Sequence, residues 1–258
     1  KIATSTYAVI VYLFVLTIVL YYSAINNFFI GDDFTWLRWA AQAPDNLLTY
    51  FTQSDGFFYR PGTKLYFYLM YHFFWLNPVA YHLVSVLLHF VVSVLFFILI
   101  NKIFKNVFLS ASAAFIFLIM SGYTEMIFWI AATGHLFNAV LGLMGLVFFI
   151  QWEEKRNKIF YFLSLLSFSF ALLFHELGVA LPLLILAYKA KDGILSLKNI
   201  LRRKDFLVLF IPVILYLITR FYAHSHWLNG DYSYDFLKLP FNFIGNVLGY
   251  VAIIFAGP

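Results

Sequence analysis

The sequence predicts an all-α, polytopic membrane protein of about eight transmembrane helices, and three observations predict it. First, 63% of the 258 residues are hydrophobic and only 11% are charged, whereas about a quarter of the residues are charged in a soluble domain. Second, the apolar residues form charge-free runs of helical length. Third, basic residues gather in the loops that would share one side of a bilayer, as the positive-inside rule expects.

The apolar runs divide the whole chain into helices and loops. They cover residues 7–25, 79–100, 107–121, 126–150, 159–174, 177–188, 206–219 and 241–256. We expect one transmembrane domain over residues 1–258, with residues 26–63 as the first outer loop and residues 64–76 as an interfacial helix. The chain begins without Met and stops within an apolar run, as a fragment of a longer protein would.

Residues 159–188 admit two interpretations, a single long helix with His175 and Glu176 in its middle or a hairpin of two short helices. The hairpin places twelve of the seventeen basic residues on one side of the membrane. A single span would put the cluster from Lys189 to Lys204 on the opposite side, against the positive-inside rule. We therefore expect the hairpin, with a cytoplasmic amino terminus and the first outer loop on the extracytoplasmic face.

Asp32 and Asp33 lie shortly after the first apolar run, in the first outer loop. Neighbouring carboxylates repel each other, so the pKa of at least one should rise unless a cation or hydrogen-bond donor compensates. A carboxylate poised in this way can act as a general base, which makes both residues candidate catalytic groups. The alternative is that they are solvated acids at a helix end.

Arg60 and Arg220 are candidate ligands of a lipid phosphate. Arg60 lies between Tyr59 and Pro61 at the predicted start of the interfacial helix, and an arginine can hold a phosphate with two parallel hydrogen bonds. Arg220 ends an otherwise apolar run, where a charge is costly and tends to mark function or snorkelling. Anchoring to ordinary lipid headgroups is the alternative for both.

His175 and Glu176 form the tip of the predicted hairpin, whose helices are short for a bilayer, so the tip should be recessed. Ionisable groups held below the surface within protein indicate a hydrophilic cavity. Glu125, at the preceding outer turn, and His135, further along the same run, should line that cavity. A structural ion pair or a buried hydrogen-bond network is the alternative interpretation.

No cofactor is predicted, and a divalent metal is not favoured. His224 and His226, followed by Asp231 and Asp235, are metal-ligand types, but their spacing matches no zinc pattern. The absence of cysteine excludes disulfides and thiol chemistry. The basic net charge does not imply nucleic acid in so apolar a chain, and the sequence contains no nucleotide-binding loop. His82 and His89 share one face of the second span, where interhelical hydrogen bonding is expected.

Several motifs occur in order along the chain. They are Asp32-Asp33, Tyr59-Arg60-Pro61, Asn77-Pro78 with Tyr81-His82-Leu83, Thr124-Glu125 with Trp129, and His175-Glu176 with Pro182. Together they resemble the GT-C superfamily of membrane glycosyltransferases, and most closely its O-mannosyltransferase-like branch, the tetratricopeptide-containing transmembrane mannosyltransferases. The resemblance covers roughly residues 28–182. Two departures are a histidine where relatives tend to have lysine before Glu176, and the absence of a tetratricopeptide domain.

The resemblance implies a GT-C-like fold and an inverting transfer of a sugar from a polyprenyl-phosphate donor at the outer headgroup level. Asp32 or Asp33 would be the base, with Asp32 favoured, while Arg60 with Tyr59, and also Arg220, would hold the phosphate. A noncatalytic GT-C-like subunit that binds lipid or a partner protein is a second hypothesis. A transporter that uses His175 and Glu176 as a relay is a third, and it is weakened because the ionisable groups gather on one face. Membrane lipids are expected contacts in every case.

Overall fold

The computed structural model of the chain describes residues 2–54, 58–120, 122, 124–190, 193–225 and 237–256. It is 86% helical and contains no strand among the described residues, so the all-α prediction is confirmed. The α-helices and the short 3₁₀ turns, labelled η, are α1 (Ile2–Tyr21), η1 (Tyr22–Asn26), α2 (Asp33–Gln42), η2 (Ala43–Asp45), α3 (Leu47–Thr52), α4 (Pro61–Phe74), α5 (Pro78–Phe104), α6 (Val107–Ile119), α7 (Thr124–Phe128), η4 (Ile130–Ala132), α8 (Thr133–Lys155), α9 (Lys158–Phe174), η5 (Glu176–Ala180), α10 (Leu181–Ala190), α11 (Ile194–Leu201), α12 (Lys204–Val208), α13 (Phe210–Tyr222) and α14 (Leu239–Ala256).

A helix occupies each apolar run of the sequence, but the helices differ in length. Among the described residues, four stretches are long and apolar enough to cross a membrane, namely Thr6–Asn26, Pro78–Phe104, Ile130–Lys155 and Lys204–Tyr222. The apolar helices α6 and α9 are shorter. Four helices of spanning length support a membrane protein, and the expected number of eight spans stays a prediction.

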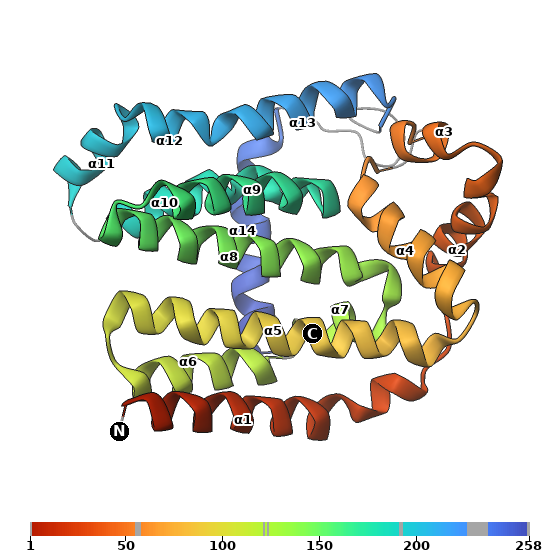
Figure 1. Cartoon of the computed structure of the whole chain (residues 1–258), viewed down its shortest axis with the longest axis horizontal. Helices are drawn as coiled ribbons and strands as arrows, with labels where there is room; N and C mark the ends of the chain where they lie inside the picture. Colours follow the sequence, from red (N-terminus) through yellow and green to blue (C-terminus); the bar gives the residue numbers. More distant parts are fainter. Residues whose placement is uncertain are drawn as a thin grey trace.

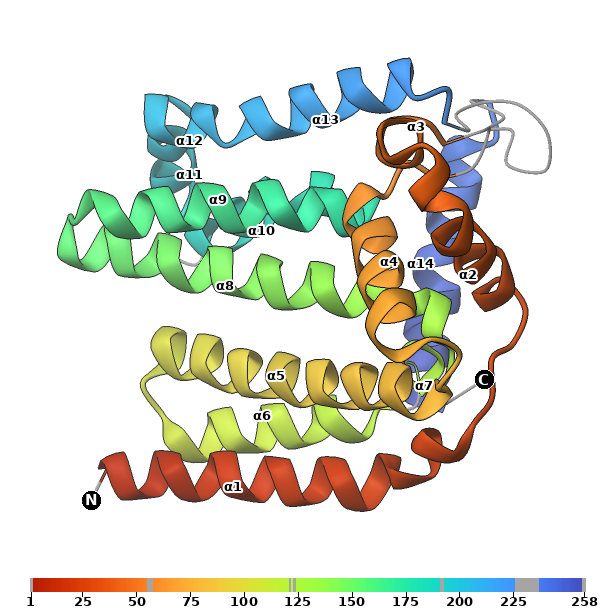
Figure 2. The ribbon, with the colours of Figure 1, turned by 45° about the vertical axis from the view of Figure 1, so that its right-hand side comes forward.

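The long helices lie side by side with roughly parallel axes (Figures 1 and 2). Helix α8 packs on α9, and α5 packs on α1, α6 and α8. Helices α2, α3, α4 and α7 gather at one end of this bundle, which we call the loop end, while α11 and α12 lie at the other, the basic end. Helix α14 crosses behind the bundle, and its described side chains at residues 240–252 are exposed.

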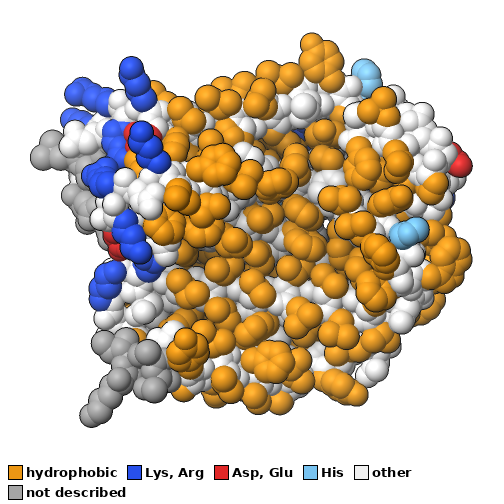
Figure 3. Space-filling model, in the orientation of Figure 1, with side chains coloured by type: hydrophobic (Ala, Val, Ile, Leu, Met, Phe, Trp, Pro, Cys, Tyr) orange, Lys and Arg blue, Asp and Glu red, His pale blue; other side chains and the backbone are white. Residues whose placement is uncertain are grey.

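Charge is distributed unevenly between the two ends. Lys and Arg side chains gather at the basic end, and the flank between the ends is covered by hydrophobic side chains (Figure 3). This arrangement matches the positive-inside pattern with the basic end cytoplasmic; the orientation itself stays a prediction. The basic residues at these helix ends and turns are Lys102, Lys105, Lys155, Arg156, Lys158, Lys189, Lys198, Arg202, Arg203 and Lys204.

The chain reverses direction after α9, in agreement with the predicted hairpin. Helix α9 ends at Phe174, and the amide of Gly178 closes a turn by donating to the carbonyl of His175, 3.1 Å away. Leu181, at the start of α10, packs against Gly142 of α8, and Ile185 shares a buried cluster with Ile150, later in α8. Helix α10 therefore runs in the same direction as α8 and antiparallel to α9.

Side-chain hydrogen bonds join neighbouring helices, as is common where helices pack within a membrane. The Ser164 hydroxyl of α9 donates to the Gly145 carbonyl of α8 at 2.8 Å. The Asn138 amide of α8 donates to the carbonyls of Ala171 and His175 at 2.9 and 3.1 Å. The fully buried His89 ring nitrogen lies 3.3 Å from the Leu118 carbonyl of α6, in agreement with the predicted interhelical role of this histidine.

The predicted interfacial helix starts at Pro61, where the Tyr59-Arg60-Pro61 motif indicated a helix start, so it extends three residues before the expected range of 64–76. It is also less superficial than expected. Helix α4 starts at Pro61, because proline suits the first helical position and the chain turns at Arg60, the N-cap residue. One side of α4 is buried, including Lys64 and Phe67, against α2 and α9. Helix α4 therefore belongs to the core of the loop end.

Candidate functional site

Aromatic side chains hold the first outer loop against the helix bundle. Trp36 of α2 is 2% exposed and stacks on Phe67 of α4, with ring centroids 5.5 Å apart. Phe29 meets the ring of Tyr81, at the start of α5, edge-on at 5.2 Å. Aromatic pairs of this kind contribute roughly 0.5–1.5 kcal/mol beyond their buried area, so the segment that carries Asp32 and Asp33 is held firmly.

Asp33 is fully buried at the start of α2 and joins two distant segments. Its Oδ1 accepts from the amide of Ala131 at 2.6 Å, and its Oδ2 accepts from the amide of Ile30 at 2.9 Å. Burial raises the pKa of Asp33 to about 6; the amide hydrogen bonds oppose this rise and the charge of Asp32 adds to it. Asp33 therefore fastens the first outer loop to η4, just before α8.

Asp32 is exposed, one residue before the first turn of α2. The preceding Gly31 has φ +52°, a conformation that L side chains rarely adopt, and Nε1 of Trp129 lies 4.0 Å from the place where a Cβ would stand. The turn thus brings the acidic pair next to Trp129, which is about one hundred residues later in the sequence. Of the two candidate bases, Asp32 is the one that a substrate can reach.

Arg60 and Glu176 form a two-pronged ion pair between α4 and η5. Arg60 Nε and Nη2 donate to the Glu176 carboxylate oxygens at 2.8 and 2.7 Å, and the guanidinium lies 4.2 Å over the ring of Phe58. Burial opposes ionisation of Glu176, but the hydrogen bonds and charge of Arg60 outweigh it and lower the pKa to about 2. The predicted phosphate ligand and the predicted cavity acid are therefore direct partners.

The rings of His175 and His135 lie against each other beside this ion pair, with centroids 3.8 Å apart. His175 Nδ1 accepts from the amide of Leu177 at 3.1 Å, and Nε2 lies 3.9 Å from Glu176. Burial lowers the pKa of His175 to about 3, and the positive charge of Arg60 contributes in the same direction. His175 is therefore neutral near pH 7, so it does not replace a lysine charge.

The carboxyl end of α13 docks on the first outer loop and brings Arg220 to the same cluster. Tyr216 Oη donates to the carbonyl of Tyr59 at 3.1 Å, and the amide of Tyr59 donates to Ser225 Oγ at 3.2 Å. The charge of Arg220 also contributes to the lowered pKa of His175. Both predicted phosphate ligands thus lie close enough to His175 to act on it electrostatically.

An apolar groove leads along the bundle to Tyr59 and Tyr216, the residues next to Arg60 and Arg220 in this arrangement. It has a volume of about 330 Å³ and lies between α9 and α13. A second apolar cavity, of about 380 Å³, lies between α5, α6, α8 and α10 and is lined in part by His135. The groove between α9 and α13 is lined by Tyr59, Leu166, Ser169, Phe170, Leu172, Leu173, Pro212, Leu215, Tyr216 and Thr219.

Glu125 is not brought into the ion-pair cluster by any recorded contact. It is exposed in the first turn of α7, and no ion pair recorded among the described residues involves it. Within the described part of the chain, no group of three His, Asp or Glu residues could hold a metal ion. His226, Asp231 and Asp235 lie outside the described residues.

Sequence reasoning missed Tyr216 and Ser225, which connect α13 to the first outer loop. Tyr216 is four residues before Arg220, so the two side chains share one helical face. That spacing was the available signal for Tyr216. Ser225 carried no comparable signal, because its contact is a hydrogen bond to a backbone amide in a distant segment.

Comparisons with known proteins do not add an independent identification. Neither the family models, nor the curated protein sequences, nor the solved structures contain a match to this chain. The site is therefore interpreted from its own geometry.

Proposed function

We propose that this chain is a membrane glycosyltransferase, similar to the O-mannosyltransferase-like branch of the GT-C superfamily, that transfers a sugar from a polyprenyl-phosphate donor on the extracytoplasmic face. One observation carries the proposal. Motifs that lie far apart in the sequence meet at the loop end, where Asp33 binds Ala131, Gly31 adjoins Trp129 and Arg60 binds Glu176. The support comes from these specific contacts between distant motifs, because polar residues gather at helix ends in any membrane bundle.

In this proposal the donor lipid occupies the groove between α9 and α13. The apolar walls of the groove suit an isoprenoid chain, and a phosphate at the end lined by Tyr59 and Tyr216 would lie beside Arg60 and Arg220. Glu176 uses the Nε and Nη2 edge of Arg60, and a guanidinium has five N–H donors, so the edge formed by its two terminal nitrogens still points elsewhere. In this proposal Glu176 orients Arg60, and Arg60 binds the phosphate with that second edge.

Asp32 acts as the general base in this proposal. Its carboxylate accepts the proton of an acceptor hydroxyl, whose oxygen forms a bond to the anomeric carbon of the donor sugar. The bond between that carbon and the phosphate oxygen breaks with its electron pair, and the arginines stabilise the charge that develops on the leaving phosphate. Asp33 is a positioning residue, because both of its oxygens bind backbone amides.

A noncatalytic subunit is the second candidate, and the closed ion pair favours it. Arg60 is already held by Glu176 at 2.7 and 2.8 Å, as in a purely structural pair. The exposed apolar side chains of α14 would suit a chain that packs against a partner protein. The two hypotheses differ in whether Asp32 is needed for sugar transfer.

Single-turnover transfer from radiolabelled polyprenyl-phosphate mannose, with the full chain in nanodiscs and a saccharide acceptor, tests the proposal. Replacing Asp32 with Asn preserves shape and removes basicity, so the rate should fall by about a hundredfold to ten-thousandfold. Glu154→Gln is the matched control, because Glu154 pairs with Lys102 and Lys105 at the basic end. Equal turnover by the parent, Asp32→Asn and Glu154→Gln would reject Asp32 as the base and favour the subunit hypothesis.

A further inference from the structure

We propose that a pocket in the first outer loop binds one neutral sugar residue of a carbohydrate substrate. The pocket has a volume of about 290 Å³, close to the lower limit for small-ligand sites. It lies between the end of α2, α3 and the start of α4, and is lined by Trp39, Gln42, Ala43, Asp45, Asn46, Thr49, Tyr50, Ser54 and Lys64. A role of this pocket in sugar transfer rests on the proposed glycosyltransferase function, but the binding of a sugar in the pocket does not depend on that function.

The pocket is held in shape by hydrogen bonds of its own walls. Lys64 Nζ donates to the carbonyls of Tyr50 and Gln53, each at 2.6 Å, and Tyr50 Oη donates back to the Lys64 carbonyl at 2.7 Å. Asn46 Oδ1 accepts from the amide of Thr49 at 3.0 Å and so caps α3. These bonds fix the floor, so a ligand would meet a preformed site, which reduces the entropy lost on binding.

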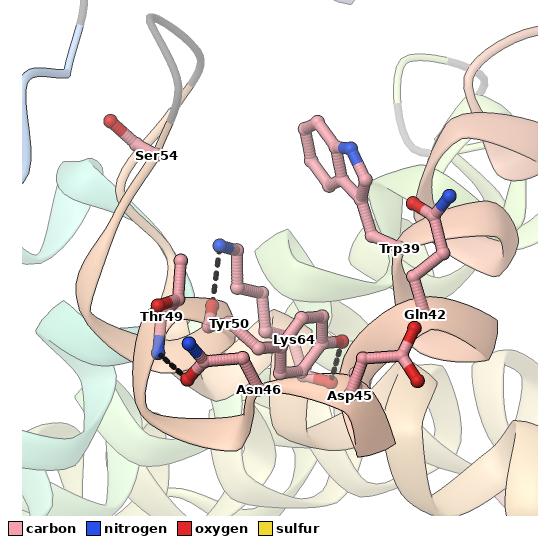
Figure 4. Close-up of a pocket in the computed structure, with 9 residues that line it drawn as sticks. Trp39, Gln42, Asp45, Asn46, Thr49, Tyr50, Ser54 and Lys64 are labelled. Carbon is pink, nitrogen blue, oxygen red and sulfur yellow. Dashed lines mark hydrogen bonds between the residues drawn. The ribbon is translucent and has the colours of Figure 1, made fainter.

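The side chains around the opening have the chemistry of a sugar site. Trp39 and Gln42 stand on one side, Thr49 and Ser54 on the other, and the Lys64 ammonium lies between them (Figure 4). An indole face packs against the C–H face of a sugar ring, while amide and carboxylate groups hydrogen-bond to its hydroxyls. Gln42 and Asp45 are exposed at the opening, where a ligand can reach them.

Charge favours a neutral ligand over an ionic one. Lys64 is 6% exposed, and its ammonium lies 5.5 and 5.1 Å from the ring centres of Trp39 and Tyr50. Asp45 supplies a carboxylate to the same pocket, so a cation and an anion are both already present. A neutral sugar can hydrogen-bond to the Asp45 carboxylate through its hydroxyls and lie beside the paired Lys64 ammonium without adding an unpaired charge.

The position of the pocket indicates which part of a substrate it takes. Helix α2 has ten residues and separates Asp32, before its first turn, from Gln42, its last residue. At 1.5 Å per residue this is about 15 Å, so the pocketed sugar is not the reacting one. The geometry indicates a more remote sugar of an oligosaccharide acceptor, whose other end reaches Asp32.

Saturation-transfer NMR with the full chain in nanodiscs, free of glycolipid and maltoside detergent, tests this inference. The probes are neutral trisaccharides of mannose, glucose or galactose. In a second set of measurements, polyprenyl-phosphate mannose is added as a competitor of the trisaccharide. We expect the parent to bind the trisaccharide saturably. Trp39→Leu should weaken this binding about tenfold, and Gln42→Ala and Asp45→Asn, which change exposed side chains, should each weaken it about threefold to fivefold. Trp75→Leu, at the far end of α4 where Trp75 is 62% exposed, should bind like the parent.

Each outcome is informative. Polyprenyl-phosphate mannose could displace the trisaccharide from the parent and itself bind more weakly to Gln42→Ala and Asp45→Asn. That result would assign the pocket to the donor and overturn the acceptor assignment. The inference would be overturned if the parent showed no saturable trisaccharide binding. It would also be overturned if the parent, Gln42→Ala and Asp45→Asn bound the trisaccharide equally, since both side chains are exposed and their replacement should leave the fold intact. Trisaccharide binding is measured without sugar transfer. Loss of transfer in Asp32→Asn therefore tests the catalytic proposal, and weaker trisaccharide binding by Gln42→Ala and Asp45→Asn tests the pocket, so the two can fail separately.

Discussion

Asp32 and Asp33 are adjacent in the sequence but have different environments. The sequence predicted that mutual repulsion would raise the pKa of one of them, and the pKa of Asp33 is indeed raised to about 6. The main cause is burial, however, and the charge of Asp32 contributes less. Which acid would be buried depends on the contact of Asp33 with Ala131, 98 residues away, and no local pattern encodes that contact.

Asp33 should make stability depend on pH. Its pKa is raised from 3.8 to about 6 in the folded chain, so the folded state binds the proton more tightly. The contribution of Asp33 to the free energy of unfolding is therefore complete below about pH 4. This contribution, up to roughly 3 kcal/mol, is lost as the pH rises to about 6.

Thermal unfolding of the parent and Asp33→Asn in detergent, between pH 4 and 7, measures this effect. The parent should lose stability between pH 4 and 6, and Asp33→Asn should lack that component. Asp45→Asn, which changes an exposed carboxylate of the same loop, should unfold like the parent. The same pH dependence in Asp33→Asn as in the parent would refute the linkage.

At the scale of elements, the sequence predicted helices well and their mutual contacts poorly. The hairpin at His175 and the helix start at Pro61 follow from local signals, namely charge, run length and proline position. Glu176 was expected in a cavity, yet its pairing with Arg60 joins residues 116 positions apart. The docking of α13 was not predictable for the same reason, since it depends on the backbone carbonyls of Tyr59 and Ala223.

Gly62 should control the approach of α4 to α9, which sets the distance between Arg60 and Glu176. A Cβ on Gly62 would lie 2.9 Å from the ring of Phe174 and 3.0 Å from the backbone of Leu173. Gly62→Ala should therefore destabilise the chain by roughly 1–3 kcal/mol, the usual cost of overpacking.

A Tm measurement and a matched glycine provide the comparison. Gly245 of α14 has no atom within 4 Å of its Cβ position, so Gly245→Ala should be neutral or stabilise by about 0.5–1 kcal/mol. An unchanged Tm for Gly62→Ala would mean that α4 and α9 tolerate a wider spacing than this account requires.

For the whole molecule, the separation of charge predicts the orientation in the membrane. Basic residues gather at the end that carries α11 and α12, and the candidate site lies at the opposite end (Figures 1 and 3). The chain has no cysteine, so single cysteines report their own side. With an impermeant thiol reagent applied outside intact cells, Ala41→Cys should react and Asn199→Cys should react only after permeabilisation. If the reagent labels both cysteines from outside, the candidate site and the basic end do not lie on opposite sides of the membrane, which contradicts the predicted orientation.

In the proposed function, Arg60 and Arg220 hold a lipid phosphate. Arginine matches phosphate as a planar fork, whereas lysine offers a point charge. A change to lysine keeps the charge but removes the planar fork, and at Arg60 it also removes the paired hydrogen bonds to Glu176. The exposed Arg38 of α2 provides the matched control.

Binding of polyprenyl monophosphate to the full chain in nanodiscs, followed by native mass spectrometry, tests this claim most directly. The account predicts saturable binding by the parent and by Arg38→Lys, and affinity about tenfold weaker or more in Arg60→Lys and Arg220→Lys, since a charge-assisted hydrogen bond contributes roughly 1.5–3 kcal/mol. No saturable binding by the parent, or equal affinity in all four proteins, would contradict it.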